Sequence, residues 1–100
     1  MTNFAAAADA LERAAIAMEN NPGLDPDGAV RIAVWGHPDT PYPDDGQGPG
    51  VEAFDLAECA IESKVAAKYG YDAGDGIDHL DRSDAIAAAR AEAARFRSYG

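Results

Sequence analysis

Aspartate recurs at every third position in the stretch YDAGDGIDHLDRSDA, at Asp72, Asp75, Asp78, Asp81 and Asp84. Carboxylates at a regular spacing could bind a metal ion, present phosphate-like charges to a partner, or cap a helix. An α-helix turns about 100° per residue, so each step of three residues slips back by about 60° and five side chains do not line up. The five aspartates therefore do not form a single charged row on a helix.

The positions of the glycines in this stretch argue against calcium binding. An EF-hand loop needs oxygen ligands at positions 1, 3 and 5, followed by glycine at position 6. Counted from Asp72, positions 3 and 5 are Gly74 and Gly76, and position 6 is isoleucine. Asp81 is a suitable N-cap for a final helix, and Asp84 stands at the capping-box position three residues later. The three earlier aspartates remain as turn residues of a Gly-rich loop or as part of a contact surface.

Two histidines and one cysteine are the other side chains that could bind a metal ion or attack a substrate. His37 and His79 each precede an aspartate by two residues, but they belong to separate predicted loops and lack the i, i+4 spacing of a zinc-binding helix. Cys59 is expected in the middle of a helix among acids that would raise its thiol pKa, so we interpret it as buried and inert. Without a GxSxG, P-loop or GxGxxG motif, we expect neither an enzyme nor a cofactor.

Apolar residues at helical spacing predict a small all-α bundle of about four helices in one domain, residues 1–100. The predicted helices cover residues 3–20, 26–36, 51–69 and 82–98, and an irregular loop covers residues 36–50. The apolar stripe of the first helix consists of Phe4, Ala8, Leu11, Ala15 and Met18. The apolar face of the third helix consists of Phe54, Ala57, Ile61, Val65 and Tyr69.

Residues 29–35 are ambiguous, because their side chains alternate as in a strand whereas Asp25 and Pro26 favour the start of a helix. No other segment alternates in this way, and a lone strand would leave its backbone groups unpaired. We therefore predict a helix here, unless two chains pair this segment across a dimer.

The loop at residues 36–50 holds four prolines and four glycines, which excludes regular structure. Tyr42 stands between two prolines and is followed by Asp44 and Asp45. We expect a stiff, presented aromatic anchor beside acids that steer a basic partner. A linker without contacts is the alternative. Trp35, just before the loop, is expected in the core or as a second anchor.

The chain carries a net charge of −10, and alanine supplies 23 of its 100 residues. Alanine favours helices and lets them approach closely. It also leaves a core with few large apolar side chains, which self-association or a partner would stabilise. The negative charge repels nucleic-acid backbones and anionic membranes and attracts basic surfaces. The first residues lack a secretion signal and no stretch is long enough to span a membrane, so we expect a cytoplasmic protein.

These observations predict an acidic interaction protein that occupies a basic, nucleic-acid-binding surface of a partner. The predicted partner-binding residues are Asp39, Tyr42, Asp44, Asp45, Glu52, Asp55, Glu58, Glu62, Asp72, Asp75 and Asp78. In size, acidity and lack of a catalytic motif the chain resembles small phage-encoded anti-CRISPR inhibitors, some of which are nucleic-acid mimics. The residues that carry the resemblance are Asp44, Asp45, Glu52, Asp55, Glu58, Glu62 and the loop 72–78. The resemblance implies binding to the guide or target-DNA channel of a surveillance complex, whose lysines and arginines hold nucleic acid.

Two other hypotheses remain open at this point. A helical adaptor or homodimer without mimicry would use its acidity for solubility and complete its thin core across alanine-rich helices. A metal protein or minor enzyme would use His37 and His79.

Overall fold

Four helices make up the described part of the chain, which is residues 3–70 and 81–99 of a computed structural model. They are α1 (Phe4–Asn20), α2 (Pro26–Trp35), α3 (Val51–Tyr69) and α4 (Arg82–Arg97). No strand occurs among these residues, so the predicted all-α fold is confirmed, and residues 29–35 are helical. The helix bounds differ from the predicted ranges by at most one residue. No described helix is long and apolar enough to cross a membrane.

The helices begin and end at residues whose local chemistry favours a terminus. The side chains of Asn3, Asp25 and Asp81 accept hydrogen bonds from N–H groups in the first turns of α1, α2 and α4, at 3.0, 2.6 and 2.8 Å. Pro26 follows Asp25 at the first helical position, where its missing N–H costs no hydrogen bond. Gly70 ends α3 with φ at 75°, in the left-handed region.

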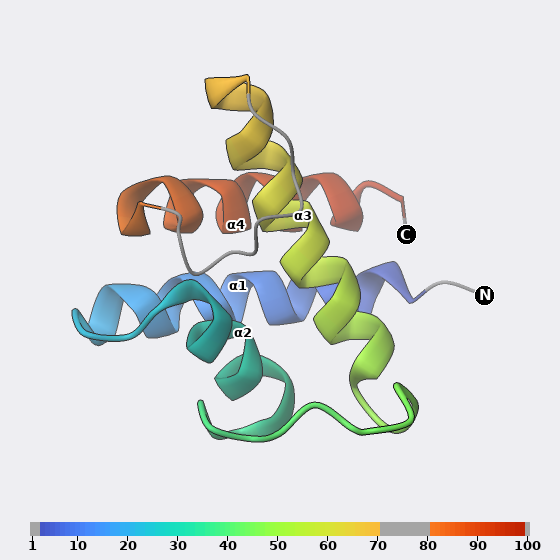
Figure 1. Ribbon diagram of the computed structural model, residues 1–100. Coiled ribbons are helices and arrows are strands. Elements are labelled where there is room, and N and C mark those ends of the chain that lie inside the picture. The colour runs from blue at the N-terminus through green and yellow to red at the C-terminus, as the bar shows by residue number, and fades with distance from the viewer. Residues whose placement is uncertain (1–2, 71–80, 100) are drawn as a thin grey trace.

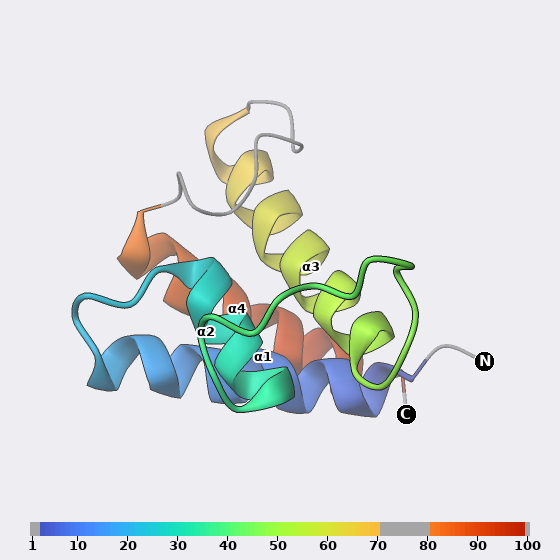
Figure 2. The ribbon, with the colours of Figure 1, turned by 60° about the horizontal axis from the view of Figure 1, so that its bottom comes forward.

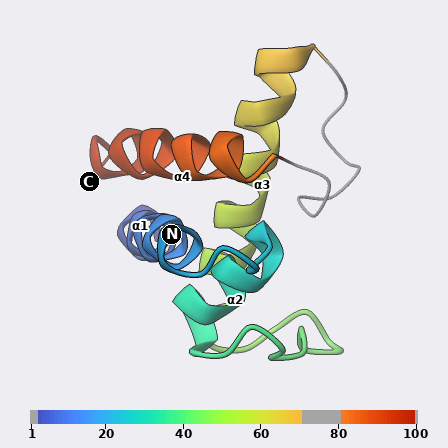
Figure 3. The same ribbon diagram turned by 90° about the vertical axis from the view of Figure 1, so that its left-hand side faces the viewer.

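The capping box predicted for Asp81 and Asp84 is only half formed: the Asp81 carboxylate accepts the N–H of Asp84 at 3.3 Å, but the Asp84 carboxylate contacts α3 instead. This second carboxylate lies 2.6 Å from Lys68 Nζ and also accepts a hydrogen bond from the Tyr69 hydroxyl. These contacts join the start of α4 to the end of α3, and they lower the pKa of Asp84. Tyr69 is 56% exposed rather than part of the apolar face, because α3 continues past α4 at this end (Figures 1 and 3).

The core lies where α1 and α4 pack against each other and α3 crosses both (Figure 1). The predicted stripe of α1 is buried apart from Phe4, which is half-buried. Alanines of α1 and α4 fill much of the interface, and they include Ala7, Ala14, Ala85 and Ala89, all 0% exposed. Because these side chains are small, the two backbones can approach closely and exclude water without large apolar residues.

Arg82 fastens the start of α4 to the end of α1. Its Nε and Nη2 donate to the carbonyl oxygen of Met18 at 3.1 and 2.7 Å. This carbonyl belongs to the last turn of α1, where no intrahelical N–H is available to it. A charged donor therefore satisfies a helix end that would otherwise depend on water.

The loop 36–50 and α2 lie on the side of α1 away from α4 (Figures 1 and 3). Figure 2 shows the loop running from the end of α2 to the start of α3. The loop reaches α3 at Gly50, whose φ is 86°. A Cβ at this position would lie 2.5 Å from Val34 Cγ1 and 2.8 Å from Trp35 Nε1, so only glycine lets the loop and α2 approach this closely.

Candidate functional site

An aromatic cluster of Trp35, Tyr42 and Phe54 holds the loop against α2 and α3. Trp35 and Phe54 stack with ring centroids 4.9 Å apart, and Tyr42 packs on them at 6.5 and 5.6 Å. The Trp35 indole N–H donates to the carbonyl of Pro49 at 2.9 Å. Such ring pairs contribute about 0.5–1.5 kcal/mol beyond the burial of apolar area. The loop is therefore anchored on the helices and is not a linker without contacts.

Tyr42 is placed differently from the expected free, projecting anchor. Its ring faces Trp35 and Phe54, and its hydroxyl donates to both carboxylate oxygens of Asp55 at 3.1 Å. Partial burial and the neighbouring Asp55 carboxylate raise the pKa of this hydroxyl. The side chain remains 36% exposed. Tyr42 thus positions the loop on α3, and a direct contact with a partner stays a prediction.

Arg31 is a second link between the loop and the helices. Its Nε lies 2.8 Å from Asp27 Oδ2, and its Nη1 donates to the Thr40 carbonyl at 2.6 Å. The guanidinium also lies 5.0 Å from the centre of the Phe54 ring, within the range of a cation–π contact. The sequence analysis missed this residue, although the i, i+4 spacing of Asp27 and Arg31 was a usable signal.

Glu58 of α3 meets Asp27 of α2 in a hydrogen bond between their side chains. One oxygen of Glu58 is fully buried. Burial raises the pKa of Asp27, but the hydrogen bonds from Glu58 and Arg31 outweigh it, and the net shift is downward. Glu58 is therefore engaged with α2, and we do not count it among the acids of the outer surface.

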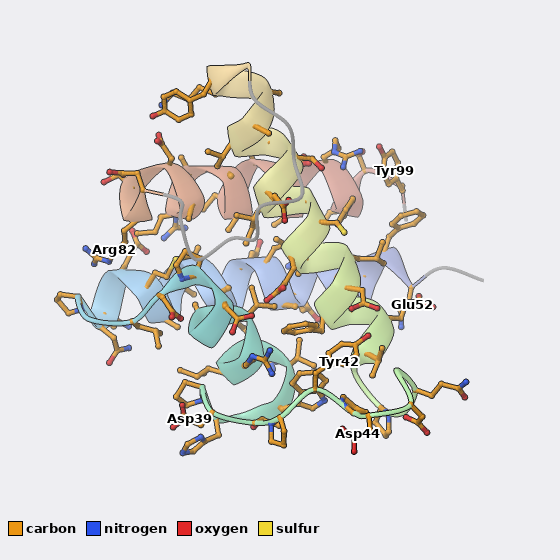
Figure 4. The ribbon with its side chains drawn as sticks, viewed as in Figure 1. Asp39, Tyr42, Asp44, Glu52, Arg82 and Tyr99 are labelled. Atoms are coloured by element: carbon orange, nitrogen blue, oxygen red, sulfur yellow. The ribbon has the colours of Figure 1, made fainter. Side chains whose placement is uncertain are left out.

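Six of the predicted acids lie on the loop and on the outer side of α3, and we call this set the acidic face. It consists of Asp39, Asp44, Asp45, Glu52, Asp55 and Glu62. Figure 4 shows three of them, Asp39 and Asp44 on the loop and Glu52 at the start of α3. Within the described residues none of the six forms an ion pair. Their hydrogen-bond donors are uncharged, such as the N–H groups that approach Asp45 and Glu52.

The arginines of α4 are engaged on the other side of the molecule. Their partners are Glu19 for Arg90, Glu92 for Arg95, and both Asp9 and Glu12 for Arg97. Glu92 is only 6% exposed, and Arg95 binds it with two nitrogens at 2.7 and 3.0 Å. Among the described acids that are not N-caps, those without an ion pair therefore lie mainly on the acidic face. Sequence reasoning missed these long-range pairs because they join residues far apart in the chain.

Cys59 is exposed, so the prediction of a buried cysteine was wrong. Its position on α3 falls opposite Ala57 and Ile61, which face the core, and this places the thiol on the side of Asp55 and Glu62. Partial burial of the thiol and the charges of Glu62 and Asp55 raise its pKa, in the direction that the surrounding acids indicated. Cys59 therefore lies on the acidic face, and its raised pKa makes the thiol a weak nucleophile.

No group of three or more metal-binding side chains occurs in residues 3–70 and 81–99. His37 Nδ1 accepts the N–H of Asp39 at 3.1 Å, so the HPD sequence closes a local turn. The residues Asp72, Asp75, Asp78 and His79 lie outside the described residues. The hypotheses that concern them stay predictions.

We compared the chain with protein-family models, with curated proteins and with solved structures, and none of the three comparisons found a match.

Proposed function

We propose that this chain is an acidic protein-binding inhibitor that occupies a basic, nucleic-acid-binding surface of a partner complex. The acidic face carries this proposal, because within residues 3–70 and 81–99 its six carboxylates form no ion pair, whereas the acids of α1 and α4 do. Lysines and arginines that normally hold phosphates attract such carboxylates. The chain would then compete with nucleic acid for the same cations.

The rigidity of the acidic face supports tight binding. The contacts of Tyr42 with Trp35 and Phe54, the Trp35–Pro49 hydrogen bond and the Arg31–Thr40 hydrogen bond hold the loop that bears Asp44 and Asp45. On α3, Glu52 and Glu62 are ten residues apart, which corresponds to about 15 Å along the helix. Carboxylates held in place before binding lose little conformational entropy when a partner docks. A basic groove would therefore meet a preformed row of negative charge.

The resemblance to small acidic anti-CRISPR inhibitors selects the first partner to test. A CRISPR surveillance complex offers a channel of lysines and arginines for its guide and target strands, and we propose that the acidic face enters it. Direct binding of this chain to nucleic acid is not expected, given its net charge of −10.

The test measures the affinity of the full chain for a purified surveillance complex, with and without bound target DNA. We expect binding that weakens steeply as salt rises and that bound DNA prevents. Replacing Asp44→Asn together with Asp45→Asn should weaken binding by about 5- to 30-fold, if each exposed charge contributes about 0.5–1 kcal/mol. Equal affinity for the DNA-loaded and the free complex would exclude mimicry.

A matched control separates the acidic face from net charge. Ala67→Lys together with Ala94→Lys changes the net charge by the same two units, at exposed positions outside the acidic face. We expect this variant to bind nearly as well as the unchanged chain. If both double variants lose the same affinity, net charge alone is responsible and the acidic face has no special role.

The competing hypothesis of a homodimer predicts that the mass measured by light scattering rises to twice the monomer mass as the protein concentration increases.

A further inference from the structure

A hollow of about 310 Å³ lies where the second half of α3 passes α4. Its lining consists of Lys64, Val65 and Lys68 from α3 and Asp84, Ala87, Ala88 and Ala91 from α4. The α4 side of the hollow consists of three short alanine side chains beside Asp84, so α4 leaves room next to Val65 of α3. Ligand pockets in proteins have mostly apolar walls and volumes of about 300–1,000 Å³. The hollow therefore has the wall chemistry and the minimum size of a small-molecule site.

The charge of this lining is opposite in sign to that of the whole chain. Two lysines and one aspartate give the lining a net positive charge, whereas the linings of the other described hollows are neutral or negative. Lys68 is held by Asp84, at 2.6 Å. Lys64 forms no ion pair within the described residues. A cation is thus available beside an apolar floor.

We propose that this hollow binds a small aliphatic carboxylate, with its chain on Val65, Ala88 and Ala91 and its carboxylate beside Lys64. If each methylene needs about the 30 Å³ of a water-sized group, the hollow holds a chain of about ten carbons. A helical peptide would need a longer groove for its i, i+4 and i+7 anchors. The site lies on the opposite side of α3 from Asp55, and it neither uses nor requires the proposed partner of the acidic face.

The test titrates sodium decanoate, below its micelle concentration, into the ¹⁵N-labelled full chain and follows amide chemical shifts. We expect saturable shifts at the residues that line the hollow. Decanol, which has the same chain without the charge, should bind about fivefold more weakly, and Lys64→Glu should weaken decanoate binding about tenfold. Ala91→Leu keeps the charges and fills the hollow, so it should abolish the saturable shifts.

Arg13→Glu is the matched control for Lys64→Glu. Arg13 also forms no ion pair within the described residues, and it lies on α1 away from this hollow. Decanoate binding should be unchanged in this variant, and the thermal unfolding midpoint of each variant verifies that it is folded. The proposal is overturned if decanoate gives no saturable shift, if the shifts map to other residues, if decanol binds equally well, or if Arg13→Glu and Lys64→Glu behave alike.

Discussion

Replacing Gly50 by alanine should destabilise the protein more than the same change at any of the other glycines with positive φ. The backbone at Gly50 has φ at 86°, and an added methyl group would overlap Val34 and the indole of Trp35. The indole is stacked on Phe54 and hydrogen-bonded to the loop, so it cannot move aside without breaking these contacts. Gly36 has nearly the same φ, 88°, but no atom lies within 4 Å of an added Cβ. It is the matched control.

The comparison of Gly50→Ala with Gly36→Ala separates the cost of the left-handed backbone from the cost of steric overlap. A left-handed backbone costs a non-glycine residue about 1–2 kcal/mol, and the loss of freedom in the unfolded chain returns about 0.4–1 kcal/mol. Both terms apply equally to Gly36→Ala and Gly50→Ala. Overlap in a packed site adds about 1–3 kcal/mol, and only Gly50→Ala incurs it. The free energy of unfolding of Gly50→Ala should therefore be lower than that of Gly36→Ala by about 1–3 kcal/mol.

Urea unfolding measures this difference, followed by circular dichroism at 222 nm and by the fluorescence of Trp35, the only tryptophan. Coincident transitions and unchanged m-values would establish that the comparison is valid. The native fluorescence of Gly50→Ala should also shift, because the indole must move. If the two variants unfold at the same urea concentration, the close approach of the loop to α2 is not as described and the reasoning fails.

Three further predictions concern charged and nucleophilic groups. The hydrogen bonds from Lys68 and Tyr69 lower the pKa of Asp84 in the folded state. They therefore stabilise the fold above the unfolded-state pKa of Asp84, and this stabilisation is lost as the pH falls through its folded-state pKa. In urea unfolding, Asp84→Asn should lack this part of the pH dependence. Iodoacetamide should alkylate Cys59 more slowly at pH 7 than a free thiol, since burial and Glu62 raise its pKa, and Glu62→Gln should speed the reaction. Arg82→Ala removes charged hydrogen bonds to the end of α1 and should lower the free energy of unfolding by about 1–3 kcal/mol.

Each of these predictions has an outcome that would contradict it. An unchanged acid dependence in Asp84→Asn would assign that dependence to other carboxylates. An alkylation rate that does not respond to Glu62→Gln would show that its charge does not reach the thiol. Arg90→Ala breaks an exposed ion pair with Glu19 and should cost at most about 1 kcal/mol. If Arg82→Ala costs no more than Arg90→Ala, the contact with the end of α1 does not stabilise the fold.

The helices could be predicted from the sequence because their signals are local. Asn3, Asp25 and Asp81 lie at the helix starts, and Gly70 lies at the end of α3. Apolar spacing then identified the buried stripe of α1. Local signals fix where a helix begins and which face is apolar, but not how far a neighbouring helix extends along that face. Tyr69 was therefore assigned to the core, although it is 56% exposed and its hydroxyl contacts α4 at Asp84.

The candidate site was predicted only in its composition. The acids of the loop and of α3 could be identified in the sequence. That they form no ion pair within the described residues could not be predicted, because this depends on which acids the arginines contact in the fold. Arg97 reaches Asp9 across 88 positions, and Arg90 reaches Glu19 across 71. Tyr42 was expected to project because prolines flank it, and the apolar rings that hold it lie on two other elements.

The pairing of α1 with α4 also has a consequence for how the chain is made. The contacts that join them span 64 to 88 positions, so most of the chain must leave the ribosome before the core can close. At about 5–20 residues per second, the residues of α4 that contact α1 are synthesised roughly 3–18 s after their partners in α1. Ordering so long an intervening segment also slows folding relative to bundles whose neighbours are consecutive. Because the stripe is rich in alanine, it exposes little apolar surface during this interval. Chaperones and other nascent chains therefore have few large apolar side chains to bind.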